Sequence, residues 1–270
     1  GLNVPNLYTL ENSVAPVAVS NFVSQYRQNS IYGNVSFGWR GMLFVDFTGR
    51  NDWSSSLPLK NCSYFYPSVS GSFVFSELIK SSWFSYGKLR GGWAQVGNDT
   101  RPYRLETRPT SSQPFNGNGV FVLPNTLNNP NLRPEKIYSW ELGLELSFLM
   151  DRVHIDATYY NSVTKDNIFR VQQSAASGST YRYTNAGVLA NQGVELATSF
   201  VPVKLKSGFT WTIGFNFAKN YNKVVELYKD ENGKDVNSLI LGTAPFAVTL
   251  EARPGMAYGQ IVGTDFYYDK

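Results

Sequence analysis

The sequence of 270 residues has one cysteine, Cys62, and one histidine, His154. A single cysteine excludes an intrachain disulfide and any metal site built from several cysteine ligands. A lone histidine lacks the partners that a zinc site requires, so we expect His154 to be a polar wall residue and no metal to be bound. No phosphate-binding glycine loop and no pairing of a nucleophile with a base is evident, so we predict no cofactor and no catalytic residue.

Long hydrophobic runs are also lacking, because no segment approaches the roughly 18 apolar residues of a membrane helix. The strands of a membrane barrel are apolar on one face only, so this absence leaves a barrel open. Charge is sparse and scattered, with 24 basic and 20 acidic residues, which argues against a nucleic-acid partner. The chain opens without an initiator or signal peptide, so we expect a mature or truncated piece.

Aromatic residues are abundant at 15% of the sequence, and they fall within segments of alternating polarity. The clearest segment runs from Ile137 to Asn161, and it is interrupted only at Met150-Asp151. Its alternation predicts a β-hairpin in which one register sorts both faces. The apolar pairs of this register are Phe148–Val153, Leu146–Ile155, Leu144–Ala157 and Leu142–Tyr159, and the polar pairs are Ser147–His154 and Glu145–Asp156.

Opposed Glu145 and Asp156 repel each other, so one of them should have a raised pKa or a basic neighbour from an adjacent strand. If the side chains of Glu145 and Asp156 pointed to opposite faces of the sheet, the predicted register would be wrong. Glu141 and Glu145 lie ~13 Å apart along one strand at ~3.3 Å per residue. That separation exceeds the ~5–9.5 Å between the carboxyl groups of glycosidases, and the wall offers no pocket, so we predict no enzyme.

Similar alternation recurs along the chain. It predicts a hairpin over residues 31–50 with its turn at 40–42, strands at 69–75 and 87–97, a pair formed by 194–200 and 209–215 around a bend at 202–207, and strands at 246–251 and 257–267. In the paired segments, Val194 should face Phe215. Long polar loops are predicted at residues 51–66, 98–136, 165–184 and 219–244.

Short and long connections therefore alternate, which is typical of an outer-membrane barrel. We predict an all-β fold, an antiparallel transmembrane β-barrel segment of about ten strands with short turns at one end and long loops at the other. Residues 1–270 would form part of one barrel domain, with loop and a possible strand in 1–30 and with hairpins and long extracellular loops in 31–270. The segment either closes on itself or belongs to a larger barrel, because lipid does not tolerate open strand edges.

The alternative fold is a soluble all-β sandwich, such as a carbohydrate-binding module, in which Leu144, Leu146, Ile155 and Ile213 would be buried beneath a second layer. In a barrel, the polar face lines the lumen. The lumen-facing candidates are Glu141, Glu145, His154, Asp156, Glu195 and Asn216. Tyr103, Phe115 and Phe121 in the longest loop are candidates for stacking on a bound ligand, although such residues more often pack the loop on itself.

Several short segments also resemble one known family. They are residues 49–58, 66–70, 88–91, 97–98, 131–136, 185–187 and 191–195, which read GRNDWSSSLP, YPSVS, KLRG, GN, NLRPEK, NAG and NQGVE. Their order and spacing resemble SusC/RagA-like TonB-dependent outer-membrane transporters.

The resemblance implies an interior segment of a large barrel in the outer membrane of a Gram-negative bacterium, in contact with outer-membrane lipid. It implies import of a glycan or peptide substrate, a SusD-like lipoprotein lid, and drive from the TonB complex through a plug region that these residues do not include. It also implies that the loop aromatics contact the substrate or the lid. A siderophore- or cobalamin-type receptor is the alternative, and the motif order argues against it.

Overall fold

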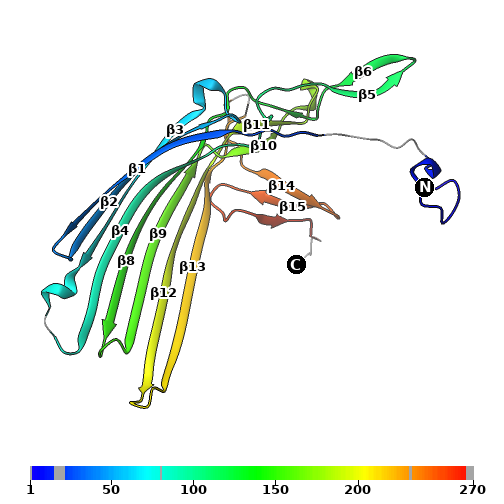
Figure 1. The fold of residues 1–270 in the computed structure, drawn as a ribbon. Coiled ribbons are helices and arrows are strands. Elements are labelled where there is room, and N and C mark those ends of the chain that lie inside the picture. Colours follow the sequence, from blue (N-terminus) through cyan, green and yellow to red (C-terminus); the bar gives the residue numbers. More distant parts are fainter. Residues whose placement is uncertain (1, 15–21, 80, 231–232, 266–270) are drawn as a thin grey trace, which may run out of the picture.

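The computed structural model describes residues 2–14, 22–79, 81–230 and 233–265. Its main feature is a curved antiparallel sheet of eight long strands, which we call the wall (Figure 1). Each wall strand pairs with the next wall strand along the chain. The wall strands are β1 (Gln28–Trp39), β2 (Leu43–Ser54), β3 (Ser63–Val74), β4 (Phe84–Asn98), β8 (Glu135–Phe148), β9 (Val153–Lys165), β12 (Val188–Lys204) and β13 (Thr210–Glu226).

The remaining strands form three small sheets at one end of the wall, and we call this region the loop layer (Figure 1). One sheet has the order β10 (Ile168–Gln172), β11 (Tyr181–Asn185), β7 (Thr126–Leu127), a second has β14 (Leu239–Ala244), β15 (Val248–Ala252), β16 (Gln260–Val262), and β5 (Thr110–Phe115) pairs with β6 (Asn118–Val122). Four 3-10 turns complete the described elements: η1 (Leu10–Asn12), η2 (Leu59–Asn61), η3 (Phe75–Leu78) and η4 (Ala175–Ser177). Within the described ranges, no helix has the length and hydropathy to cross a bilayer.

The β8–β9 hairpin has the predicted register, with Phe148 opposite Val153 and Glu145 opposite Asp156. Its turn is wider than the predicted break, because residues 149–151 all have positive φ, between 56° and 61°. The β1–β2 hairpin is confirmed as well, and it turns through Arg40 and Gly41, whose φ values are 50° and 68°. In both hairpins, alternating polarity was sufficient to predict the register because one face of each strand is apolar along most of its length.

The predicted pairing of β12 with β13 is wrong in register. Val194 faces Lys219 rather than Phe215, which instead faces Thr198. The strand β12 continues through Pro202 to Lys204, with an irregularity between Phe200 and Val203. A proline is tolerated at position 202 because the pairing of β12 with β9 already ends at Phe200. No hydrogen bond to β9 is therefore lost through the missing N–H of Pro202. The shift is an even number of residues, so each face keeps its predicted side chains.

The strand count and several boundaries also differ from prediction. The wall has eight strands rather than about ten, because the segments predicted at 246–251 and 257–267 form β15 and β16 of a separate small sheet. Residues 266 and 267 lie outside the described ranges. Strands β2, β3 and β13 extend into segments predicted as loops, and in residues 1–30 the structure shows η1 and the start of β1. These strand ends lack alternation because backbone pairing continues beyond the apolar band.

The apolar face of the wall is not covered by any described part of the chain. Leu144 and Ile213 are 38% and 46% exposed on it, while Leu146 and Ile155 are half-buried among their neighbours. This exposure excludes the soluble sandwich, whose core would be buried between two sheets.

Buried apolar side chains instead lie at the loop end of the wall. One cluster, the β13 cluster, contains Val171, Val224, Leu227, Leu239 and Ala252. The other, the β3 cluster, contains Leu57, Tyr64 and Leu132.

Within the described ranges the wall remains an open sheet with β1 and β13 at its edges. Every residue of β1 is exposed. Among the described residues, backbone hydrogen bonds to the outer edge of β13 occur only near its loop-side end, where the backbone of Val224 exchanges two 2.8 Å hydrogen bonds with Gly255 and Met256. Unpaired backbone groups along the remaining edges are the natural docking places for further strands.

Candidate functional site

The pairing registers bring all six predicted lumen residues onto the polar face of the wall. Glu145 and Asp156 share a row with Asn216, and Glu195 lies opposite Thr158 in the adjacent row. The polar face is hollowed in two places. One hollow of about 360 Å³ is lined by residues that include Arg90, Asp156, Glu195 and Asn216, and another of about 280 Å³ by residues that include Ser70, Glu141 and Tyr160. The polar face is therefore the concave one.

The opposed acids on this face have the basic neighbours that their repulsion requires. Arg90 on β4 donates two hydrogen bonds to Asp156, at 3.1 and 2.8 Å, and a third to the Thr158 hydroxyl at 2.6 Å. Lys88, also on β4, places its Nζ 3.6 Å from a carboxylate oxygen of Glu145. The expectation of a basic neighbour from an adjacent strand is thus confirmed for Glu145, whereas the basic neighbour of Asp156 comes from β4, two strands away.

Gly143 makes room for the Arg90 side chain. It lies directly opposite Arg90 across the β4–β8 pair. A Cβ added at this glycine would lie 2.5 Å from Nε of Arg90, so any larger residue would displace the guanidinium. The glycine is therefore what allows an arginine from one strand to reach an aspartate two strands away.

His154 lies where the sequence predicted, beside Ser147. Its Nδ1 is 3.1 Å from the Ser147 hydroxyl and its Nε2 is 3.9 Å from Glu145. Across the described residues, no group of three histidine, cysteine or carboxylate side chains is placed to hold a metal ion.

A second polar network lies where β1, β2 and β3 reach the loop layer. Asp52 is only 2% exposed and accepts hydrogen bonds from Arg50 at 2.8 Å, from Gln28 at 2.5 Å and from the Tyr66 hydroxyl. Nearby, Asp99 accepts from the hydroxyl groups of Ser54 and Ser56. Sequence reasoning assigned no role to these two acids. The feature that could have identified them is an aspartate that accompanies other polar residues where a strand continues into a predicted loop.

Other segments that carry the family resemblance meet in the same region. The two hydrogen bonds between the Asn185 side-chain amide and the backbone of Arg133 are both 2.8 Å long. The Arg133 guanidinium lies 2.6 Å from Asp166, and Glu135 accepts a 2.7 Å hydrogen bond from the Ile168 backbone N–H. These contacts fasten the loop layer to the ends of β8 and β9, so the motif residues act here as structural ties.

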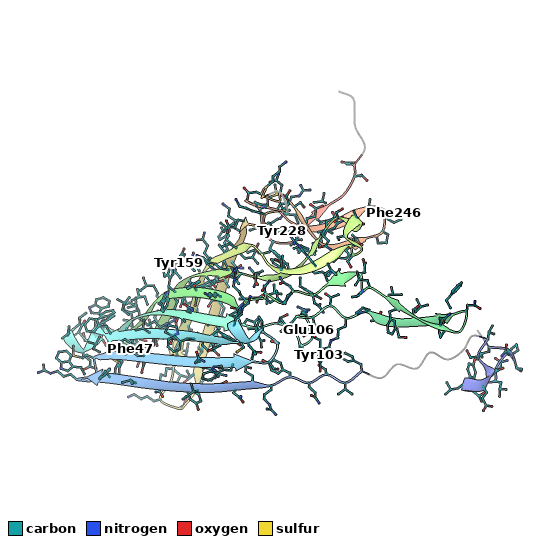
Figure 2. All side chains as sticks on the ribbon, turned by 90° about the horizontal axis from the view of Figure 1, so that it is seen from above. Phe47, Tyr103, Glu106, Tyr159, Tyr228 and Phe246 are labelled. Carbon is teal, nitrogen blue, oxygen red and sulfur yellow. The ribbon has the colours of Figure 1, made fainter. Side chains whose placement is uncertain are left out.

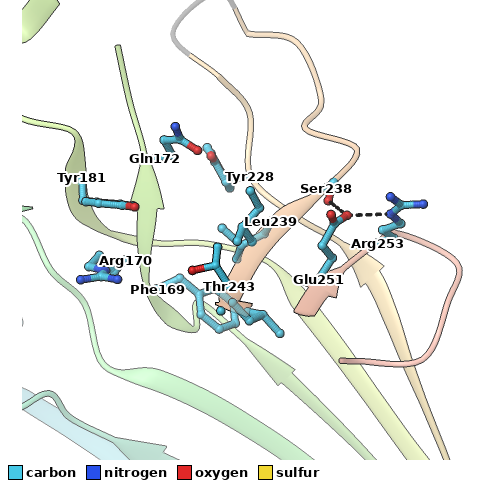
Figure 3. Close-up of a pocket in the computed structure, with 13 residues that line it drawn as sticks. Phe169, Arg170, Gln172, Tyr181, Tyr228, Ser238, Leu239, Thr243, Glu251 and Arg253 are labelled. Carbon is cyan, nitrogen blue, oxygen red and sulfur yellow. Dashed lines mark hydrogen bonds and ion pairs between the residues drawn. The ribbon is translucent and has the colours of Figure 1, made fainter. Parts of the chain in front are cut away.

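A cleft lies within the loop layer, between the β10–β11 pair and β14 (Figure 3). Its volume is about 820 Å³. On one side the Arg170 guanidinium stacks 4.4 Å from the ring centre of Tyr181, and Phe169 and Tyr228 add further aromatic surface. Burial raises the pKa of Tyr228. The cleft combines aromatic rings with a cation, which suits a polar ligand that has flat or apolar faces.

The opposite side of this cleft is held by Glu251. Its carboxylate accepts hydrogen bonds from Ser238 at 2.5 Å, Thr249 at 2.6 Å and Arg253 at 2.8 Å. These donors, with Ser238 the strongest influence, lower the pKa of Glu251 to about 2. Sequence reasoning missed this cleft, because three segments distant in the chain form it and none carries a recognisable motif.

The three predicted loop aromatics are not brought together. The Tyr103 hydroxyl accepts a 2.9 Å hydrogen bond from the Gln25 backbone, and its ring meets Phe22 edge-on at 6.3 Å. Phe115 and Phe121 lie on the β5–β6 hairpin and are 78% and 72% exposed. That hairpin projects away from the wall (Figures 1 and 2). The Tyr103 side chain thus packs against the segment that precedes β1, while the two phenylalanines are exposed.

Comparison with known proteins gives consistent results. The family model described as TonB dependent receptor-like, beta-barrel matches residues 3–270. TonB-dependent receptor P3 of Formosa agariphila is 25% identical over 96% of this chain and 26% of its own length. TonB-dependent receptor SusC of Bacteroides thetaiotaomicron is 26% identical over 73% of this chain and 21% of its own length.

Solved structures show the same fold. The RagAB peptide importer in its closed-closed state matches with a TM-score of 0.77 at 22% identity, over 94% of this chain and 28% of that chain. The chain spans about a quarter of the length of the curated relatives it matches.

Proposed function

The chain belongs to the TonB dependent receptor-like β-barrel family of the outer membrane of Gram-negative bacteria, and we propose that it forms part of the wall and loop layer of an importer. The substrates proposed are glycans or peptides. Support comes from the relatives, one of which is the receptor SusC, while the structural neighbour RagAB is a peptide importer.

The observation that carries this proposal is the opposite character of the two faces of the wall. The convex face exposes apolar side chains such as Leu144, and the concave face carries paired charges such as Arg90 and Asp156. A sheet of this kind separates lipid from an aqueous lumen. The lumen face consists of Glu141, Glu145, His154, Asp156, Glu195 and Asn216 with their neighbours.

The open edges of the wall fit a place inside a larger barrel. Further strands of the same protein pair with β1 and β13, and residues 1–270 then form one part of a single barrel domain. The long loops lie on the extracellular side, where loops of such barrels are longest. A SusD-like lipoprotein covers them, and the TonB complex drives transport through a plug region.

The loop layer is the proposed ligand-contact region. Its cleft, lined in part by Arg170, Tyr181 and Tyr228, and the exposed Phe115 and Phe121 are the contacts proposed for the substrate or the lid. We do not propose catalysis. Glu145 and Asp156 are each ion-paired with a cation of β4, so these two carboxylates have a structural role in the wall.

An uptake experiment with the full-length receptor tests this function. Cells that express the receptor should accumulate a fluorescent oligosaccharide or peptide, and cells without the receptor, without TonB or without the neighbouring lipoprotein should not. Substituting Arg170→Ala and Tyr181→Ala together should lower uptake, whereas Arg108→Ala, at an exposed surface pair, should not. Uptake that persists without TonB would contradict the proposal.

A further inference from the structure

The convex face of the wall carries very few charges, and they are gathered at one end. Among the described residues of the eight wall strands, the charged side chains that share the face of Leu144 are four lysines and one glutamate. They are Lys136, Lys165, Lys219, Lys223 and Glu226, and all lie in the loop-side half of β8, β9 and β13. Strands β1 to β4 contribute none to this face.

Two of these lysines are placed against each other. Lys136 on β8 is the direct cross-strand partner of Lys165 on β9, so their Cβ atoms lie ~4.5–5.5 Å apart. The ammonium group of Lys165 lies 5.6 Å from the ring centre of Tyr138. Directly opposed like charges destabilise a sheet unless an opposite charge lies between them.

No described carboxylate supplies that opposite charge within 4.0 Å of either lysine. Glu226 shares the row of Lys165, but it lies two strands away, which is ~10 Å at the usual spacing between strands. On the concave face the situation is reversed, because Arg50, Lys88 and Arg90 each have an acid beside them. Among the described residues of the wall strands, a directly opposed pair of unbalanced cations therefore occurs on the convex face only.

The lysine pair lies just above the loop-side aromatic belt. Trp93 and Trp140 are cross-strand partners on the convex face, and the Trp140 ring lies 5.3 Å from that of Tyr159. Phe148 at the turn end is ~26 Å along β8 from Trp140, about the height of the apolar band of a membrane barrel. Lys136 lies ~13 Å beyond Trp140 on the same strand, which is the level of the lipid headgroups once the strand tilt is included.

We propose that Lys136 and Lys165, with Tyr138 beside them, bind the phosphate group of an anionic lipid in the outer leaflet. The phosphate lies between the two ammonium groups and removes their repulsion, and the acyl chains run down the apolar face past Trp140. Lys223, in the row of Tyr138, and Lys219 extend the same positive field along the wall. This inference rests on the contact of the convex face with lipid and not on the import function.

Binding of phosphatidic acid to the full-length receptor tests the site. The receptor in neutral detergent should bind a fluorescent phosphatidic acid in preference to phosphatidylcholine. The double variant Lys136→Gln/Lys165→Gln should lose about twenty- to thirty-fold in affinity, since each lysine near such a surface contributes roughly a factor of five. The matched control is Lys204→Gln/Lys206→Gln, which removes the same charge at the turn end and should bind as the unchanged receptor does.

Thermal unfolding in phosphatidylcholine nanodiscs supplies a second readout. There the double variant should unfold at the same or a higher temperature, because the repulsion between the lysines is gone. With phosphatidic acid added, the order should reverse. A double variant that keeps its affinity, or that is less stable in phosphatidylcholine, would overturn the proposal. Equal competition by inorganic phosphate at the same concentration would also overturn it, since the site would then hold only an adventitious ion.

Discussion

The wall and the loop layer use different sources of stability. In the wall, the apolar side chains face outward, and Leu142 is 51% exposed. Where the loop layer meets the loop-side ends of the wall, Leu132 and Val224 on β13 are fully buried and carboxylates such as Asp52 on β2 are enclosed by donors. The loop layer is therefore organised as a water-soluble domain is, with a small core and satisfied polar groups. In the proposed barrel, the wall depends on its backbone ladder and on lipid.

This difference decides how each region should respond to substitution. Loss of a buried methyl group costs most where protein surrounds it, because the cavity cannot be refilled. On the convex face lipid chains can fill the space. The cost of introducing a charge should follow the opposite pattern. It should be higher on the convex face, which does not meet water in the proposed barrel, than in the loop layer, which does.

The largest effect should come from Leu132→Ala in the β3 cluster. Truncating a fully buried leucine costs about 2–5 kcal/mol, which should open the start of β3 and the adjoining loops. Hydrogen exchange of the backbone amides in residues 57–66 measures this opening. Leu142→Ala on the convex face is the matched control and should change protection by less than about 1.5 kcal/mol. Equal effects would mean that the two regions are built alike.

A charge placed on each face of the wall should give the next largest effect. Leu144→Arg puts a cation near the middle of the apolar band and should cost about 2–4 kcal/mol. Ala218→Arg, at an exposed position of the concave face opposite Glu195, should cost under about 1 kcal/mol because water solvates it. Urea-induced unfolding in lipid vesicles measures both. If Leu144→Arg caused no loss of stability, the convex face could not be in contact with lipid.

Removing the cation beside Asp156 should have a smaller effect. The variant Arg90→Met leaves Asp156 opposed to Glu145 and should cost about 1 kcal/mol, because the pair is partly exposed and solvent screens it. The double variant Arg90→Met/Asp156→Leu should recover most of that loss. Unfolding of both variants in the same vesicles measures the coupling, and purely additive losses would show that the guanidinium does not stabilise the acid pair.

The smallest effect concerns the pH dependence of the loop-layer cleft. The folded pKa of Glu251, about 2, lies below the ordinary value of 4.5. Its contribution to stability is therefore full above about pH 4.5 and is lost as the pH falls toward 2. Hydrogen exchange in β14 and β15 should accelerate over that interval. Glu251→Gln should flatten the response, while Glu226→Gln should leave it unchanged. If hydrogen exchange in Glu251→Gln still accelerated as the pH falls, the titrating group would be a different one.

Alternation of polarity within the sequence was sufficient to predict the two faces, the β1–β2 and β8–β9 registers, and the gathering of Glu145, Asp156 and His154 on one side. These are local properties, because a strand with one apolar face permits only one sorting of its side chains. The family resemblance likewise followed from short segments read in order.

Tertiary contacts decided the rest. The register of β12 with β13 depended on how Pro202 is accommodated beside the end of β9, and the partner of Asp156 came from β4, far away in sequence. The loop-layer cleft exists only because separate segments meet, whereas the opposition of Lys136 and Lys165 follows from the β8–β9 register itself. Pairing between distant segments is set by the free energy of the whole sheet and its surroundings, and no single stretch of residues contains it.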